Sequence, residues 1–151
     1  MLIIHEELWE SDKIIKVSTS KDWESADCGL LVQCSLDKLK EMIENNEGRP
    51  AVVIIDCNKG ALPPLSMFVK MFAFLAKIRN ILSVKLTFTI VYVKSDQEQQ
   101  TVDNILKMYK SVRPIIKAQT KDDIHNIMLQ RDIAEAEMRS FDDEDDTLEI
   151  D

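Results

Sequence analysis

The hydrophobic positions of this chain fall into runs and stripes that are separated by short polar segments. Residues 50–57 and 85–93 are apolar runs rich in β-branched side chains, a pattern typical of strands buried on both faces of a sheet. Between them, residues 65–80 repeat apolar side chains at helical spacing after two prolines, which suit the first turn of a helix. Strand, helix and strand form a βαβ unit, so we expect the two strands to be parallel.

Weaker patterns precede this unit. Residues 2–9 and 13–17 flank a short polar turn, which predicts an antiparallel pair at one edge of the sheet. Residues 29–33 are expected to form another short strand. Ser35 is then expected to be the N-cap of a helix at residues 36–46, whose apolar side chains fall on one face.

The pattern continues after the second buried strand. Residues 95–98 have the spacing of a capping box and predict a helix that Pro114 ends. Residues 115–118 are expected to form a last short strand, and a last helix is expected from Thr120 towards residue 139. The sequence therefore predicts a single α/β domain with a mixed, mainly parallel sheet flanked by helices.

Length and composition agree with this expectation. A chain of 151 residues with 45% hydrophobic side chains is typical of one domain with a substantial core. No apolar run approaches the roughly 20 residues of a membrane span, and the N-terminus lacks the order of a signal peptide. The three cysteines lie in or beside apolar runs, which favours reduced thiols over disulfides. We therefore expect no transmembrane segment and a reducing, cytoplasmic compartment.

The net charge of −8 is unevenly distributed. Residues 140–151 hold seven of the 27 acidic side chains and no basic one, so the first 139 residues carry 19 basic against 20 acidic side chains. We divide the chain into a domain at residues 1–139 and an acidic tail at residues 140–151. A nearly neutral body without a Lys/Arg cluster argues against direct nucleic-acid binding, which needs basic groups along one face.

The order of helices and strands after residue 35 resembles a known fold. Together with the runs at residues 52–56 and 114–124, it is similar to the STAS domain of anti-anti-sigma factors and, more distantly, to the core of lipid-binding CRAL-TRIO domains. STAS domains carry an Asp-Ser-Ser-Gly-like run with a phosphorylatable serine where the helix begins. Only Ser66 matches here, without the Asp and Gly. The resemblance implies a phosphorylation site at Ser66 or, through the more distant relation, a lipid ligand.

Motifs for catalysis, cofactors or metals are absent from the sequence. His5 and His125 are not at ligand spacing from a cysteine or carboxylate. Gly60 is alone in its loop, whereas phosphate and dinucleotide loops use several glycines. Asp56 ends a central strand, where catalytic groups of α/β sheets often lie, but no motif places a second catalytic group beside it. We interpret Asp56 as a loop-bracing residue and expect no enzyme activity and no cofactor.

The helix expected at residues 65–80 has more apolar surface than one packed face requires. One face is expected to pack on the sheet. A second apolar face remains, rich in Met and Phe side chains that adapt to partner surfaces. Neighbouring helices of the same domain are the alternative cover for this face. The residues that we assign to a partner interface are Met67, Met71, Phe74 and Ile78.

The acidic tail also contains apolar side chains. These could dock on an apolar patch of a partner while the carboxylates meet a basic patch. Ser140 precedes a run of acidic residues and is a candidate site for an acid-directed kinase. A solvated appendage is the alternative reading of the tail. The tail residues expected to dock are Phe141, Leu148 and Ile150.

These observations favour a non-catalytic protein–protein interaction module that acts as a scaffold or regulatory subunit of a larger assembly. The partner would be a protein with an apolar and a basic patch, and a homo-oligomer is left open. A phosphorylation-regulated, anti-anti-sigma-like regulator is the first alternative. A CRAL-TRIO-like lipid carrier is the second alternative.

Overall fold

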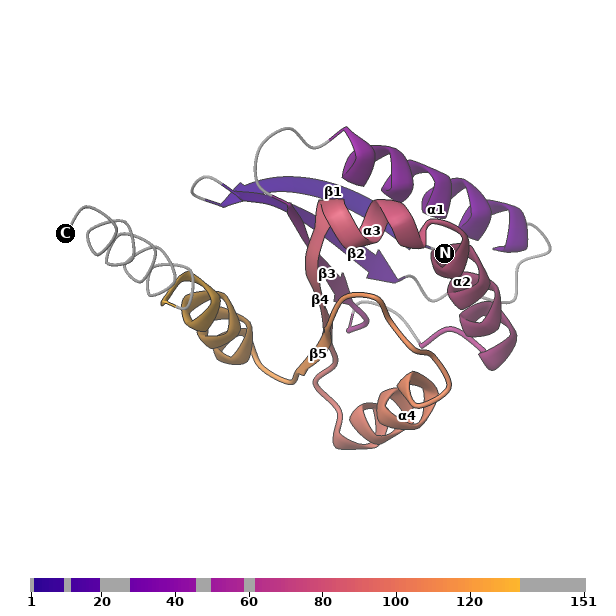
Figure 1. Ribbon diagram of the computed structural model, residues 1–151. Helices are drawn as coiled ribbons and strands as arrows, with labels where there is room; N and C mark the ends of the chain where they lie inside the picture. Colours follow the sequence, from indigo (N-terminus) through magenta and orange to yellow (C-terminus); the bar gives the residue numbers. More distant parts are fainter. Residues whose placement is uncertain (1, 10–11, 20–27, 46–49, 59–61, 134–151) are drawn as a thin grey trace. The chain divides into compact units, whose positions relative to one another are not determined.

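The computed structural model describes residues 2–9, 12–19, 28–45, 50–58 and 62–133 (Figure 1). Its contacts divide the chain into two units, Met1–Gln119 and Thr120–Asp151. The first unit contains, in chain order, β1 (Leu2–Trp9), β2 (Asp12–Thr19), α1 (Cys28–Glu44), β3 (Ala51–Asp56), α2 (Leu65–Lys77), α3 (Arg79–Lys85), β4 (Leu86–Tyr92), α4 (Asp96–Leu106) and β5 (Ile115–Ala118).

The described strands of the first unit form one sheet in which the spatial order follows the chain, β1-β2-β3-β4-β5. β1 is antiparallel to β2, whereas β2, β3, β4 and β5 pair in parallel. The predicted α/β class with a mixed, mainly parallel sheet is therefore confirmed. Because right-handed crossovers that advance in one direction stay on one face, we expect the connecting helices to lie together. Figure 1 shows α1 and α2 next to each other on one side of the sheet, and α1 also contacts α3.

The two apolar runs of the sequence are the central strands β3 and β4. Val52, Val53, Ile54 and Ile90 are all buried, and because successive side chains point to opposite faces, both faces of β3 are apolar. This is the composition expected of parallel strands that are covered on both sides.

The structure corrects one predicted strand. Residues 29–33 belong to α1, so the predicted strand there is wrong and Ser35 lies inside a helix and is not its N-cap. Val32, Leu36 and Ile43 are buried on one face of α1, and their spacing of four and seven residues is helical. The apolar stripe of α1 extends on both sides of Ser35, whereas the predicted helix began only after this residue.

Two other helices end earlier than predicted. The helix expected at residues 65–80 divides at Ile78, whose backbone dihedrals (φ −100°, ψ 21°) leave the helical region. The break places Ile78 and, one turn later, Leu82 in the core. α4 begins at the predicted cap, where the Glu98 N–H donates to Ser95 Oγ at 3.4 Å, but it ends at Leu106, well before Pro114.

The described part of the second unit is a helix at residues 121–133. Its start is a reciprocal capping box, as Thr120 predicted: the Asp123 N–H donates to Thr120 Oγ1 at 3.1 Å, and the Thr120 N–H donates to Asp123 Oδ2 at 3.0 Å. The tail and the predicted domain boundary at residue 140 lie outside the described residues. Among the described residues, no helix has the length and apolar character needed to cross a membrane.

Candidate functional site

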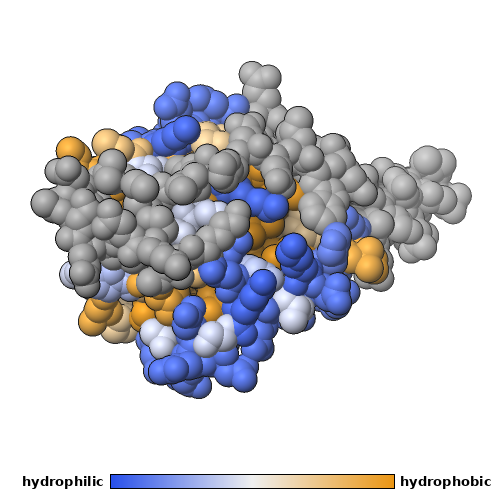
Figure 2. All heavy atoms as spheres, turned by 180° about the vertical axis from the view of Figure 1, so that it is seen from behind, coloured by the Kyte–Doolittle hydropathy of each residue, from blue (hydrophilic) through white to orange (hydrophobic). Residues whose placement is uncertain are grey.

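Helix α2 is apolar in composition, yet none of its residues is fully buried. Leu65 and Val69, one turn apart, remain 56% and 55% exposed, and Ala73 continues their stripe one turn further along the outer face. These side chains form an exposed apolar stripe along one helix face, and contiguous exposed apolar surface makes a helix face a candidate interaction site. On the face of the molecule seen in Figure 2, hydrophobic surface is divided into several areas bordered by hydrophilic side chains.

The segment of the chain that contains α2 carries basic side chains only. Residues 57–95 contain six basic side chains and no acidic one, in a chain whose net charge is −8. Three of the basic side chains, Lys70, Lys77 and Arg79, are exposed on or directly after α2. The balance of 19 basic against 20 acidic side chains over residues 1–139 conceals this basic segment. The spacing of the acidic residues along the chain would have revealed it.

The residues predicted to bind a partner lie deeper than this stripe. Met67, Met71 and Phe74 are half-buried and pack against the core cluster that α1, α3 and the sheet form. Ile78 is 6% exposed and belongs to that core. Their assignment to a partner interface stays a prediction, and the most exposed apolar side chains of the helix are on its other face.

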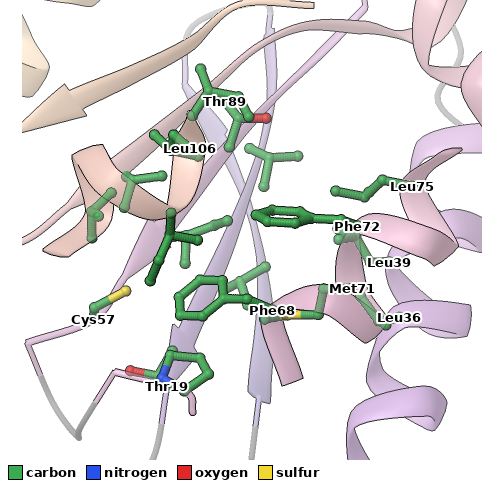
Figure 3. Close-up of a pocket in the computed structure, with 18 of the residues that line it drawn as sticks. Thr19, Leu36, Leu39, Cys57, Phe68, Met71, Phe72, Leu75, Thr89 and Leu106 are labelled. Carbon is green, nitrogen blue, oxygen red and sulfur yellow. The ribbon is translucent and has the colours of Figure 1, made fainter. Parts of the chain in front are cut away.

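Between α2 and the sheet lies a cavity of about 130 Å³. All four described helices of the first unit contribute to its wall, and the floor is one face of β2, β3, β4 and β5. Phe68 and Phe72 extend from α2 towards the middle of this space, across from Cys57 and Leu106 (Figure 3). At about 24 cal/mol per Å³, an empty cavity of this size costs about 3 kcal/mol of stability.

An aromatic stack adds to the contacts that hold helix α2 against the rest of the unit. The Phe72 and Tyr109 rings lie 4.6 Å apart between centroids and nearly parallel, at 3°. Phe68 adds a tilted contact to Phe72 at 6.0 Å. Tyr109 lies in the segment after α4. The sequence predicted that this segment continues the helix, so periodicity did not predict the stack.

Cys57 lines the cavity at the carboxyl edge of the sheet and is 3% exposed. Burial is the main cause that raises the pKa of its thiol from 9.0 to about 12, and the carboxylates of Asp56 and Glu98 add to the rise. The adjacent Thr19 hydroxyl opposes the rise, although its oxygen is buried without a hydrogen-bond partner of good geometry. The thiol is therefore protonated and behaves as a neutral apolar group, not as a nucleophile.

The carboxyl edge of the sheet is held by side-chain hydrogen bonds to the backbone. Asp56 Oδ1 accepts the Asn58 N–H at 2.9 Å, and Asn58 Oδ1 accepts the Lys94 N–H at 2.8 Å. Gln99 Nε2 donates to the carbonyls of Val93 and Ala118, at 2.7 and 2.9 Å. Asp56 thus braces the loop after β3, which is the role that the sequence favoured over catalysis.

Other candidate residues are less informative. Ser66 is exposed in the first turn of α2, and its phosphorylation stays a prediction. His125 is exposed, and the side chain of His5 lies outside the described residues. The tail candidates, which also lie outside them, are Ser140, Phe141, Leu148 and Ile150. Within the described ranges, no group of three or more His, Cys, Asp or Glu side chains is placed to hold a metal ion.

Comparison with known proteins adds no relative to this picture: no family model, no curated protein and no solved structure matches the chain. The function must therefore be argued from the site itself.

Proposed function

We propose that this protein is a non-catalytic protein–protein interaction module and that the outer face of α2 is its binding surface. The observation that carries the proposal is the exposure of Leu65 and Val69, each more than half, on a helix that buries no residue completely. Covering both side chains would remove apolar surface from water, and burial stabilises by about 25 cal/mol per Å².

The charges around the stripe define the chemistry of the partner. Lys70 and Lys77 lie on α2 and Arg79 begins α3, and residues 57–95 contain six basic side chains and no acidic one. A partner that presents apolar side chains among carboxylates would match this face in both respects. The apolar contacts would supply most of the affinity, because exposed ion pairs contribute only about 0–1 kcal/mol each.

The test is a double substitution on the outer face, Leu65→Glu with Val69→Glu. Both side chains are exposed and glutamate is a good helix former, so the variant is expected to keep the circular dichroism spectrum and melting temperature of the original chain. Native pull-down with mass spectrometry is expected to lose the partners of the original chain, with affinity at least about 30-fold weaker if the pair is a binding hot spot.

The control is Leu30→Glu, which introduces a glutamate at a leucine that is 67% exposed on α1, and it is compared with the single variant Leu65→Glu as well as with the double variant. The control is expected to retain the partners. Partners retained by a folded double variant would contradict the assignment of α2. Charged residues at Met71 and Phe74 are expected instead to lower the melting temperature, because both side chains pack on the core.

A further inference from the structure

The cavity beneath α2 is a feature that a protein-interaction surface does not explain. Its floor is formed by strand residues such as Val53 and Val91, and its roof by Phe68 and Phe72. No polar atom contributes to its surface. A buried water needs about two to four polar partners, so a space of this kind does not hold water stably.

We infer that this cavity is a binding site for a small nonpolar molecule, or for the hydrocarbon end of a larger one. Its volume of about 130 Å³ is close to that of apolar cavities of about 150 Å³ that stay dry and bind benzene. The chemistry of the wall selects against charge. It consists of aliphatic and aromatic side chains, the neutral Cys57 thiol, and Thr19 and Thr89, whose oxygen atoms add no polar surface. The ligand class is therefore a hydrocarbon group of about six carbons without a polar anchor.

The structure also indicates where such a ligand would enter. On the sheet side the wall is made largely of buried side chains such as Val17, Val53 and Val91. On the α2 side it is made of half-buried ones, among them Met71 and Leu75. α2 is the only one of the wall's helices that contributes no fully buried residue, so displacing it disturbs the core least.

Benzene is a suitable probe because it has the inferred size and no polar group. With the original chain, benzene near its solubility limit is expected to raise the melting temperature, since a ligand that binds only the folded state stabilises it. In a methyl NMR spectrum the shifts are expected at cavity methyls such as those of Leu39, Val91 and Ile115. No shift at these methyls and no rise in melting temperature would overturn the inference.

Substitutions on β4 locate the site. Thr89 lines the cavity and Thr87 of the same strand does not, so Thr89→Phe fills the space whereas Thr87→Phe leaves it open. Thr89→Phe is expected to weaken benzene binding by at least about tenfold, and Thr87→Phe by less than about twofold, because only a ring inside the cavity competes with the probe. Equal binding by the two folded variants would place the benzene elsewhere and overturn the inference.

A second variant covers the case in which Thr89→Phe does not fold. Leu75→Ala removes a half-buried wall residue from α2 and keeps a good helix former there. The enlarged cavity is expected to bind benzene at least as tightly and also to accept naphthalene, and loss of benzene binding in this folded variant would contradict the inference. None of these residues lies on the outer stripe of α2, so the outcome is independent of the interface proposal.

Discussion

At the scale of single residues, Cys57 shows how position decides chemistry. A thiol at the carboxyl edge of a parallel sheet lies where many α/β proteins place reactive groups. Here burial and two neighbouring carboxylates raise its pKa to about 12, which keeps the proton on the sulfur. The sequence predicted that the cysteines are reduced. It did not reveal the contribution of Glu98, because the fold brings this residue near Cys57.

The raised pKa predicts a loss of stability in alkaline solution. Below pH 9 the thiol is protonated in both the folded and the unfolded chain, and its contribution is constant. Between pH 9 and about 12 the unfolded chain releases the proton while the folded chain retains it, so the free energy of unfolding falls as pH rises. The expected slope from this group is about 1.4 kcal/mol per pH unit.

Cys57→Ala isolates this contribution, because the other titrating groups, including Tyr109, are common to both chains. The variant is expected to be less stable at pH 8 through the larger cavity, and the difference from the original chain is expected to shrink above pH 9. Urea unfolding of both chains across this range measures the difference. A gap that stays constant up to about pH 10.5 would show that the thiol is not shifted.

At the scale of elements, the sequence predicted strands better than helix ends. β3, β4 and β5 are found where apolar runs placed them, because a buried strand carries its signal in its own residues. The helix predicted at residues 36–46 began too late because Ser35 is a typical N-cap residue. Val32 and Leu36 nevertheless belong to one buried stripe on either side of Ser35. α4 ends at Leu106, before Tyr109. The Tyr109 ring stacks on Phe72, a residue far away in the sequence, and a local pattern does not reveal such a contact. The cavity depends on how several elements pack, and no local pattern encodes it.

The Phe72–Tyr109 stack predicts how α2 is held. Since α2 has no fully buried residue, this stack and the contacts of its half-buried side chains fix its position. Tyr109→Ala is expected to destabilise α2 by roughly 0.5–1.5 kcal/mol beyond the loss of buried area. Amide hydrogen exchange within α2 is expected to become about tenfold faster, while exchange within α1 stays the same.

The neighbouring Met108→Ala is the control for this substitution, because Met108 is exposed and is not part of the stack. It is expected to leave exchange in α2 unchanged. Faster exchange in α1 and α2 alike after Tyr109→Ala would point to general destabilisation and would contradict a specific role of the stack.

At the scale of the whole molecule, the charges of the chain are separated along the sequence. Residues 57–95 are basic without any acidic side chain, whereas residues 140–151 are acidic without any basic one. The acidic segment also carries Phe141, Leu148 and Ile150, so a second copy of this chain has the apolar and acidic composition that we propose for the partner of the outer face of α2.

We expect this complementarity to produce self-association that depends on salt. Sedimentation of the full-length chain at low ionic strength is expected to show dimers, and about 1 M salt is expected to weaken them, because screening then acts within about 3 Å. A chain of residues 1–139 is expected to remain monomeric and folded under both conditions. Identical sedimentation of the two chains at low salt would exclude a role for the tail.

The strand order of the sheet has one further consequence, for the way the chain reaches its native state. Each described strand after β1 pairs with the strand that precedes it in the sequence, so each pairing closes a loop no longer than one turn or one crossover. Loop-closure entropy rises with loop length, and this order therefore keeps the entropic cost of each pairing small and the contact order low for a parallel sheet. During synthesis the β1–β2 hairpin can serve as the template on which β3, β4 and β5 are added in the order in which they leave the ribosome.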